Sequence, residues 1–226
     1  TADYNTAIGY NALAANTTGT RNVSIGSITL DANTTGSDNT AIGYQALTAN
    51  TTGVDNTAVG SGALYLNTTA SNNTACGAAA LDANTTGEEN TAVGRMALSA
   101  ITTTNENTAI GMNAGAACTG SKNTFMGKGA CPNATSCDEG VAIGHDAGSN
   151  VSTADSYVII GDSAVGSGVM TGADNTAVGK NAGYALTGGH ESTLIGRDSG
   201  TGITTGVNNT CIGFNAGTGS SPSGNI

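Results

Sequence analysis

The sequence predicts an all-β protein, a parallel β-solenoid whose chain winds into short stacked coils. Three observations lead to this prediction. A five-residue phrase, Asn-Thr-Ala-Ile-Gly at residues 39–43, returns along the whole chain at nearly constant spacing; β-branched and apolar residues alternate within it; and turn-forming residues separate its copies. A fixed short period over the full length is typical of solenoids, in which each repeat is one stacking unit.

The glycine that closes the phrase marks the period. The step is 17 residues, with one step of 16 and one of 18, through Gly9, Gly26, Gly43, Gly60, Gly77, Gly94, Gly111, Gly127, Gly144, Gly161, Gly179, Gly196 and Gly213. We therefore expect about thirteen coils, the first and last incomplete, in a single domain over residues 1–226. Coils of this length allow only two or three short sides, which predicts a narrow β-roll or β-helix.

The residues before this glycine alternate as in a β-strand. The residue directly before it is always apolar, and the residue two positions earlier is always Thr or Val. Residues two apart share one face of a strand, so we expect both columns to point inward. The predicted structural core is Ile8, Ile25, Ile42, Val59, Val93, Ile110, Ile143, Ile160, Val178, Ile195 and Ile212, with Cys76 and Met126 in the same apolar column.

The residue between these two columns is mostly Ala, as at Ala58 and Ala92. Such small side chains suit a face that packs closely against another chain, and a compact outer surface is the alternative. If the chain forms trimers, we expect the Ala column to be the contact.

The column four residues after the glycine divides the chain into two coil types. Residues 1–110 have Leu there and Asn-Thr-Thr-Gly corners, which predicts wider coils with a second short strand; residues 111–226 mostly have Gly and are more irregular. Glycine permits positive φ, so the second type is expected to turn more sharply.

Composition excludes several classes of function. Lys and Arg number 6 against 16 Asp and Glu, so a nucleic-acid partner is not expected. No apolar run is long enough to insert into a membrane as a helix. Because the chain begins at Thr1, we expect a mature product or part of a longer protein. The two histidines, His145 and His190, lie in different coils without a repeated acidic partner, so we expect no enzyme.

The phrase Gly-Val-Ala-Ile-Gly at residues 140–144, followed by Asp-Ala-Gly-Ser at 146–149, resembles the head repeats of trimeric autotransporter adhesins. The longer repeat with its Asn-Thr-Thr-Gly corner is also similar to repeats of large bacterial surface proteins and phage tail-fibre-like proteins. The period here is longer than in the typical adhesin head. The resemblance implies a left-handed parallel β-roll, assembled as a trimer, in an exported adhesin or fibre.

Asn-x-Ser/Thr sequons are abundant. Glycosylation is considered at Asn16, Asn33, Asn50, Asn67, Asn84 and Asn133, and the first five occupy one column. In a glycosylating secretory pathway these positions would form a sugar-coated edge. The alternative is that Asn and Thr are simply favourable turn and ladder residues.

Three of the five cysteines, Cys118, Cys131 and Cys137, lie where the period is irregular. Cys118 and Cys137 lie on corners of successive coils and are expected to be able to pair, and Cys131 with Cys137 is the local alternative. A disulfide would agree with an extracellular setting. Cys76 and Cys211 are read as small buried hydrophobes.

The sequence suggests two further ligands, Ca²⁺ and ice, and neither is expected. An acidic column precedes the strands, at Asp38, Asp55, Glu89, Glu106, Glu139, Asp174 and Glu191, which could hold Ca²⁺ or form a solvated edge. No cofactor is expected. Thr pairs at the corners, such as Thr34-Thr35, suggest an ice-binding ladder, but adjacent residues do not share a strand face, and the strand Thr column exchanges with Val and is predicted to point inward.

We therefore expect a non-enzymatic extracellular fibre or filament segment that presents a repetitive surface for self-assembly or adhesion. Its principal partner is itself, as a homotrimer or a head-to-tail filament stacked through exposed strand edges. The alternative is a trimeric phage tail fibre or adhesin head that binds a host surface glycan or protein.

Overall fold

The computed structural model describes residues 2–219 and 223–224. Over these residues it contains no helix and thirteen strands of three residues each, all parallel and in chain order within one sheet. The predicted parallel β-solenoid is confirmed. The strands are β1 (Thr6–Ile8), β2 (Val23–Ile25), β3 (Thr40–Ile42), β4 (Thr57–Val59), β5 (Thr74–Cys76), β6 (Thr91–Val93), β7 (Thr108–Ile110), β8 (Thr124–Met126), β9 (Val141–Ile143), β10 (Val158–Ile160), β11 (Thr176–Val178), β12 (Thr193–Ile195) and β13 (Thr210–Ile212).

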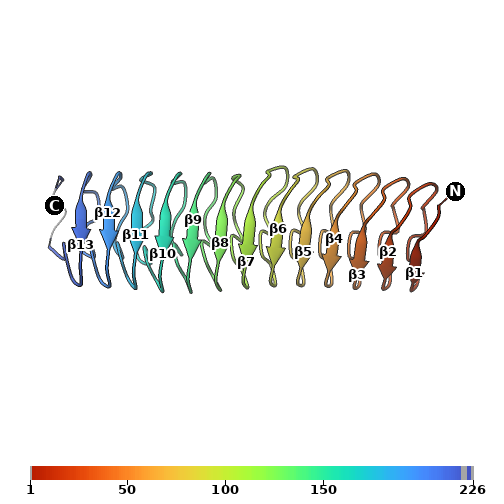
Figure 1. Cartoon of the computed structure of the whole chain (residues 1–226), viewed down its shortest axis with the longest axis horizontal. Coiled ribbons are helices and arrows are strands. Elements are labelled where there is room, and N and C mark those ends of the chain that lie inside the picture. Colours follow the sequence, from red (N-terminus) through yellow and green to blue (C-terminus); the bar gives the residue numbers. More distant parts are fainter. Residues whose placement is uncertain (1, 220–222, 225–226) are drawn as a thin grey trace. The chain divides into compact units, whose positions relative to one another are not determined.

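The chain forms two compact units, Thr1–Thr108 and Ala109–Ile226. Their boundary falls close to residue 110, where the coil type changes in the sequence. The first unit holds β1–β6 and the second holds β8–β13, and within each unit the strands lie side by side, one per coil (Figure 1). Strand β7 lies at the boundary.

Neighbouring strands pair without any slip of the repeat. In the first unit Thr40, Ala41 and Ile42 pair with Thr57, Ala58 and Val59. In the second unit the same columns stay aligned between β10 and β11, although this step is 18 residues long, because Val158 pairs with Thr176. The extra residue is therefore accommodated in the connecting segment and not in the strand.

Backbone hydrogen bonds also join the coils outside the strands. Leu47 N donates to Ala63 O at 2.9 Å, and Thr51 N donates to Thr68 O at 2.8 Å. These segments are nevertheless turns, because the Leu column has positive φ, for example 53° at Leu47 and 51° at Leu64. The predicted second strand of the Leu-type coils is therefore wrong: the described coils have one short strand and a series of turns.

The strand side of the interior is lined by small side chains. The middle residue of the strand points inward, and Ala41, Ala58, Ala75 and Ala92 are fully buried. The side chains of the Leu column are also fully buried, from Leu30 to Leu98. The core of the first unit is thus built from the strand Ala column, the Leu column and the small residues three positions after the marker glycine, such as Ala46 and Ala63.

The predicted core of bulky aliphatic residues is therefore wrong. In the strands every residue of that column is half-buried or exposed: Ile8, Ile25, Ile42, Val59, Val93, Ile110, Ile143, Ile160, Val178, Ile195 and Ile212. The alternation correctly predicts the strand, but alternation alone does not say which face is inside. In the first unit the Leu column fills the interior, so the inward strand position has room only for a small residue such as Ala.

The marker glycine is required by the backbone. Gly60 has a φ of 136°, and a Cβ placed there would lie 2.6 Å from the carbonyl carbon of Gly77 in the next coil. A side chain would therefore separate two coils that must remain hydrogen-bonded. This close approach explains why every repeat keeps a glycine at this position.

In the second unit the Leu column becomes mostly Gly, and larger strand residues fill the volume. Gly148 has a φ of 63°, and a Cβ there would lie 3.3 Å from Cδ1 of Ile159, which stands where the first unit has Ala. Leu194 occupies the corresponding space beside Gly200. These glycines adopt positive φ, but the Leu residues of the first unit adopt it as well, so the φ of this column does not support the predicted sharper turn of the second coil type.

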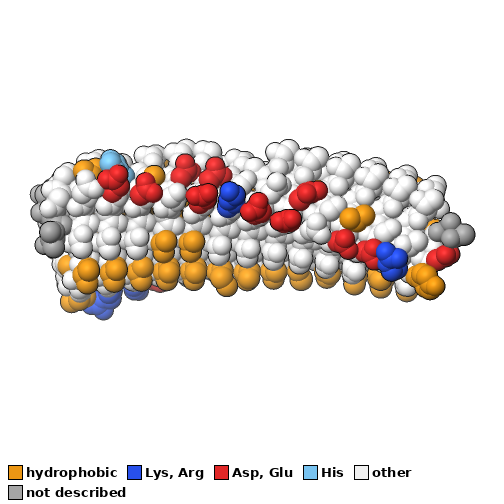
Figure 2. All heavy atoms as spheres, turned by 45° about the horizontal axis from the view of Figure 1, so that its top comes forward, with side chains coloured by type: hydrophobic (Ala, Val, Ile, Leu, Met, Phe, Trp, Pro, Cys, Tyr) orange, Lys and Arg blue, Asp and Glu red, His pale blue; other side chains and the backbone are white. Residues whose placement is uncertain are grey.

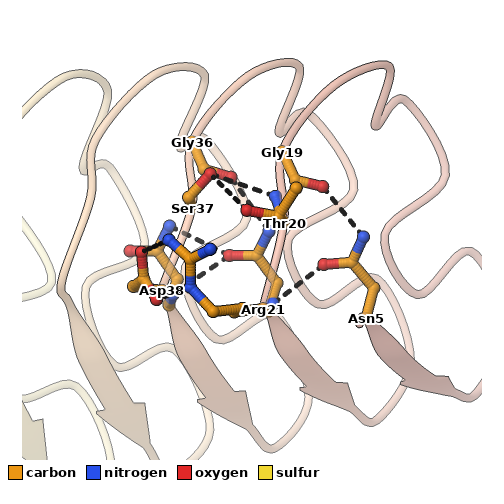
Figure 3. A network of polar contacts seen from close by, with 9 residues as sticks. Asn5, Gly19, Thr20, Arg21, Gly36, Ser37 and Asp38 are labelled. Atoms are coloured by element: carbon orange, nitrogen blue, oxygen red, sulfur yellow. Dashed lines mark hydrogen bonds and ion pairs between the residues drawn. The ribbon is translucent and has the colours of Figure 1, made fainter. Parts of the chain in front are cut away.

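Two ladders of Asn side chains hold the first unit together. In the strand ladder, which precedes the strands, each Asn Oδ1 accepts the backbone N–H of the Asn in the next coil, at 2.8–3.1 Å; its members are Asn5, Asn22, Asn39, Asn56, Asn73, Asn90 and Asn107. Nδ2 of Asn5 also donates to Gly19 O at 2.8 Å (Figure 3). The ladder therefore satisfies buried backbone groups that the short strands leave unpaired.

The corner ladder consists of Asn16, Asn33, Asn50, Asn67 and Asn84. Each Nδ2 from Asn33 onward donates to Oδ1 of the preceding member at 2.9–3.1 Å and to the carbonyl three residues later in its own coil. Ile101 occupies the next corner, and Oδ1 of Asn84 has no hydrogen-bond donor among the described residues. The ladder thus ends where the corner becomes apolar.

Candidate functional site

The most distinctive surface of the protein is the outer strand face, formed by the first and third residues of the strands. The first residue is Thr or Val and is half-buried in β2–β6 and β8–β13. The third residue is aliphatic, Met or Cys and more accessible, with 37% exposed at Ile42, 36% at Val93 and 37% at Ile195. Each unit therefore presents two parallel rows, one carrying mainly hydroxyls and one mainly apolar groups.

The outer strand face differs in charge from the rest of the surface. None of the described strands contains Asp, Glu, Lys or Arg. Figure 2 shows hydrophobic side chains in a row along the lower edge of each unit and acidic side chains in a separate row above. Exposed apolar side chains repeated in adjacent coils are uncommon on monomeric proteins and mark interaction surfaces.

The Ala column cannot provide a contact between chains. Ala58 and Ala92 have no exposed surface, because they point into the coil between the Leu residues and the neighbouring Ala residues. The prediction that this column forms a trimer contact is therefore wrong. The residues on either side of it, such as Thr57 and Val59, are the ones that face outward.

Most of the considered glycosylation sites are inaccessible in the folded chain. Asn33, Asn50, Asn67 and Asn84 are fully buried, and the Nδ2 atom that would carry a sugar is used in the corner ladder. For these four positions the structural alternative, ladder residues, is the correct reading. Asn16 is half-buried, and its Nδ2 donates to Gly19 O at 2.9 Å. Asn133 is exposed.

The acidic column lies on the surface as a solvated edge. Asp55, Glu89, Glu106, Glu139, Asp174 and Glu191 are exposed and adopt positive φ, as does half-buried Asp38. Arg21 Nη2 contacts Asp38 Oδ2 at 2.7 Å (Figure 3), and this hydrogen bonding lowers the pKa of the Asp38 carboxyl. Among the described residues no group of three or more His, Cys, Asp or Glu side chains is arranged to hold a metal ion.

Cys118, Cys131 and Cys137 come together in the interior of the second unit. All three are buried free thiols. Cys131 Sγ lies 3.3 Å from Tyr157 Oη, and the Tyr157 hydroxyl donates to Cys137 Sγ at 3.6 Å. Burial raises the pKa of Cys131 and of Tyr157. Cys211 is buried as expected, whereas Cys76 stands in the exposed apolar column.

The two histidines lie on the surface beside carboxylates. His145 Nδ1 is 3.3 Å from Asp162 Oδ1 and 3.4 Å from Asp146 Oδ2, while His190 Nδ1 is 3.9 Å from Glu191 Oε2. The ion-pair contacts of both imidazole rings are thus with surface carboxylates of the same or the next coil.

Comparison of the chain with protein-family models, with curated proteins and with solved structures found no match. Within the described residues no helix is long and apolar enough to cross a membrane. The fold and the surfaces of the chain itself therefore carry the functional argument.

Two features of the structure were not predicted from the sequence: the strand ladder and the buried Tyr157 side chain. The strand ladder had a signal, since Asn precedes the Thr column in most repeats, but that Asn was not interpreted as a hydrogen-bonding residue. Tyr157 replaces this Asn in β10's coil and gave no motif of its own. Its role became visible only when the structure placed its hydroxyl between two cysteines.

Proposed function

We propose that the protein is a structural fibre segment that self-associates through its outer strand face. The single observation that carries this proposal is the row of exposed aliphatic side chains, including Ile42, Val93 and Ile195, on an uncharged sheet face. The proposed assembly is a homotrimer, as the resemblance to adhesin head repeats implies. It has no enzymatic role.

Repetition makes weak contacts sufficient. Burying a fully exposed Val or Ile is worth about 1.5–3 kcal/mol, so the partly covered side chains here contribute about 1 kcal/mol each. Because the same pair of rows recurs in every coil of a unit, these contributions add over many coils. Two sheets can pack face to face at about 10 Å through such side chains.

We further propose an extracellular location, as a segment of a secreted or surface fibre. The resemblance to adhesin and tail-fibre repeats supports it. In that setting the acidic edge and the corners remain exposed on the assembled fibre and are available to a host glycan or protein. Binding of a host receptor, as in an adhesin head or phage tail fibre, is the alternative role of the same assembly.

Charges placed on the outer strand face test the assembly. We expect the double variant Val59→Glu, Val93→Glu to remain folded, because both side chains are already accessible. An unpaired charge buried in an interface costs about 3–5 kcal/mol, so association should weaken at least about 100-fold. Sedimentation equilibrium measures the change in mass, and circular dichroism verifies the fold.

The matched control puts the same charges on the corners of the same unit. Thr52 and Thr86 are exposed and lie away from the strands, so Thr52→Glu, Thr86→Glu should leave association unchanged. A wild-type chain that stays monomeric at all concentrations, or equal association of both double variants, would overturn the proposal.

Ice binding is a second candidate function, favoured by one observation. The strand Thr column faces outward, in rows of hydroxyls beside aliphatic groups, and not inward as its exchange with Val predicted. The variant Thr57→Val, Thr91→Val keeps the shape of these side chains and removes two hydroxyls. Ice binding predicts thermal hysteresis in the wild type that this variant strongly reduces, whereas the self-assembly proposal predicts no hysteresis in either.

A further inference from the structure

The cysteine cluster lies where several departures from the repeat pattern meet. Gly140 takes the place of a strand-ladder Asn, and a Cβ at Gly140 would overlap the Tyr157 ring. The Tyr157 side chain therefore fills the space that an Asn side chain occupies in other coils. Cys118 stands at a corner where the first unit has Asn, and Cys137 stands where neighbouring coils have Gly120 and Ala154.

These departures bring Cys118 and Cys137 onto neighbouring corners of successive coils, close enough for each thiol to shift the pKa of the other. A single amide also bridges them, because Asn123 Nδ2 donates to Cys118 Sγ at 3.6 Å and to Cys137 O at 2.8 Å. Asn123 thereby holds the corner of one coil against the next coil.

Cys131 is separated from this pair by the phenol of Tyr157. The Tyr157 hydroxyl lies between Cys131 Sγ, at 3.3 Å, and Cys137 Sγ, at 3.6 Å. Pairing Cys131 with Cys137 would require the phenol to leave its buried site. The structure thus distinguishes between the two pairings that the sequence left open.

We propose that Cys118 and Cys137 form a disulfide when the chain folds in the presence of a small-molecule disulfide such as oxidised glutathione. One of the two cysteines attacks the oxidant as a thiolate, which forms a mixed disulfide and releases one glutathione thiolate. The other cysteine then attacks the protein sulfur of that mixed disulfide, releases the second glutathione thiolate and forms the bond. Two protein thiols are oxidised, and one glutathione disulfide is reduced to two thiols.

Both thiols are fully buried once the unit has folded, so the oxidant reaches them while the chain folds. The product ties together the corners of two successive coils and closes a loop through β8, which stabilises the second unit by restricting the unfolded chain.

Peptide mapping of the full chain tests the proposal. The chain is refolded with oxidised and reduced glutathione, alkylated under denaturing conditions without reductant, and digested. We expect one internal disulfide between the peptides that contain Cys118 and Cys137, with Cys131 recovered alkylated. The urea midpoint of the second unit should also rise relative to the reduced chain.

Serine variants make the result specific. Cys131→Ser should still form the disulfide, whereas Cys118→Ser and Cys137→Ser should lose both the linked peptide and the increase in midpoint. If a serine variant does not fold, the wild-type peptide map decides alone. A Cys131–Cys137 link, or three alkylated cysteines in oxidised and folded wild-type chain, would overturn the proposal.

Discussion

Replacing Ala58 by Glu is expected to destabilise the first unit severely, whereas Val59→Glu, one residue further on, should leave it folded. Ala58 is fully buried and pairs with Ala41 and Ala75 in the adjacent strands. A Glu at this position would overfill a packed interior and bury a carboxylate without a partner. Together these effects cost at least about 4 kcal/mol of the free energy of unfolding.

Urea denaturation followed by far-UV circular dichroism measures this difference. The two variants carry the same charge at neighbouring positions, so each serves as the control for the other. Ala58→Ser gives a further comparison, since it keeps the small size without adding a charge. Equal stability of Ala58→Glu and Val59→Glu would contradict the inward orientation of the Ala column.

This pair of substitutions also reverses what sequence reasoning expected, and the reversal has a physical cause. The alternation at residues 57–59 correctly predicts a strand, and the constant period correctly predicts parallel stacking in register. Hydrophobicity favours placing Val59 inside, because large aliphatic side chains usually are buried. The choice of face depends instead on the interior width of the coil, which is set by turns far from the strand.

The turns could not be predicted for a related reason. Leu47 and Leu64 have positive φ, a conformation that non-glycine residues seldom adopt and that costs about 1–2 kcal/mol. Nothing in the local sequence indicates it, since the burial of Leu in the neighbouring coils compensates for the strain. The glycines at the same column of the second unit were the only local signal.

The candidate surface was recognisable from the sequence only as a pair of columns. Their regular spacing was evident, but the proposal that they form an interaction face needed the structure, which places both columns on the outside of the coil. For the cysteines the sequence left two pairings open. The position of the Tyr157 hydroxyl, 26 residues from Cys131 in the chain, could not be derived from either local pattern.

The second large effect is expected from Asn56→Ala in the strand ladder. The fully buried Asn56 side chain accepts from Asn73 N at 3.1 Å and donates to Ala70 O at 2.8 Å and to Asn39 Oδ1 at 3.1 Å. Alanine removes three hydrogen bonds of about 1 kcal/mol each and leaves the Asn73 N–H buried without an acceptor. We expect a loss of about 3–5 kcal/mol in the free energy of unfolding.

Asn72→Gly is the matched control, because it also removes an Asn amide in the same unit. Asn72 is exposed and has a φ of 62°, which glycine adopts without strain, so its substitution should change stability by less than about 1 kcal/mol. Amide hydrogen exchange gives a second readout, since Asn73 N–H should lose protection in Asn56→Ala before the rest of the unit. If both variants unfold at the wild-type urea concentration, the ladder does not stabilise the fold, and the backbone bonds between coils must be sufficient without it.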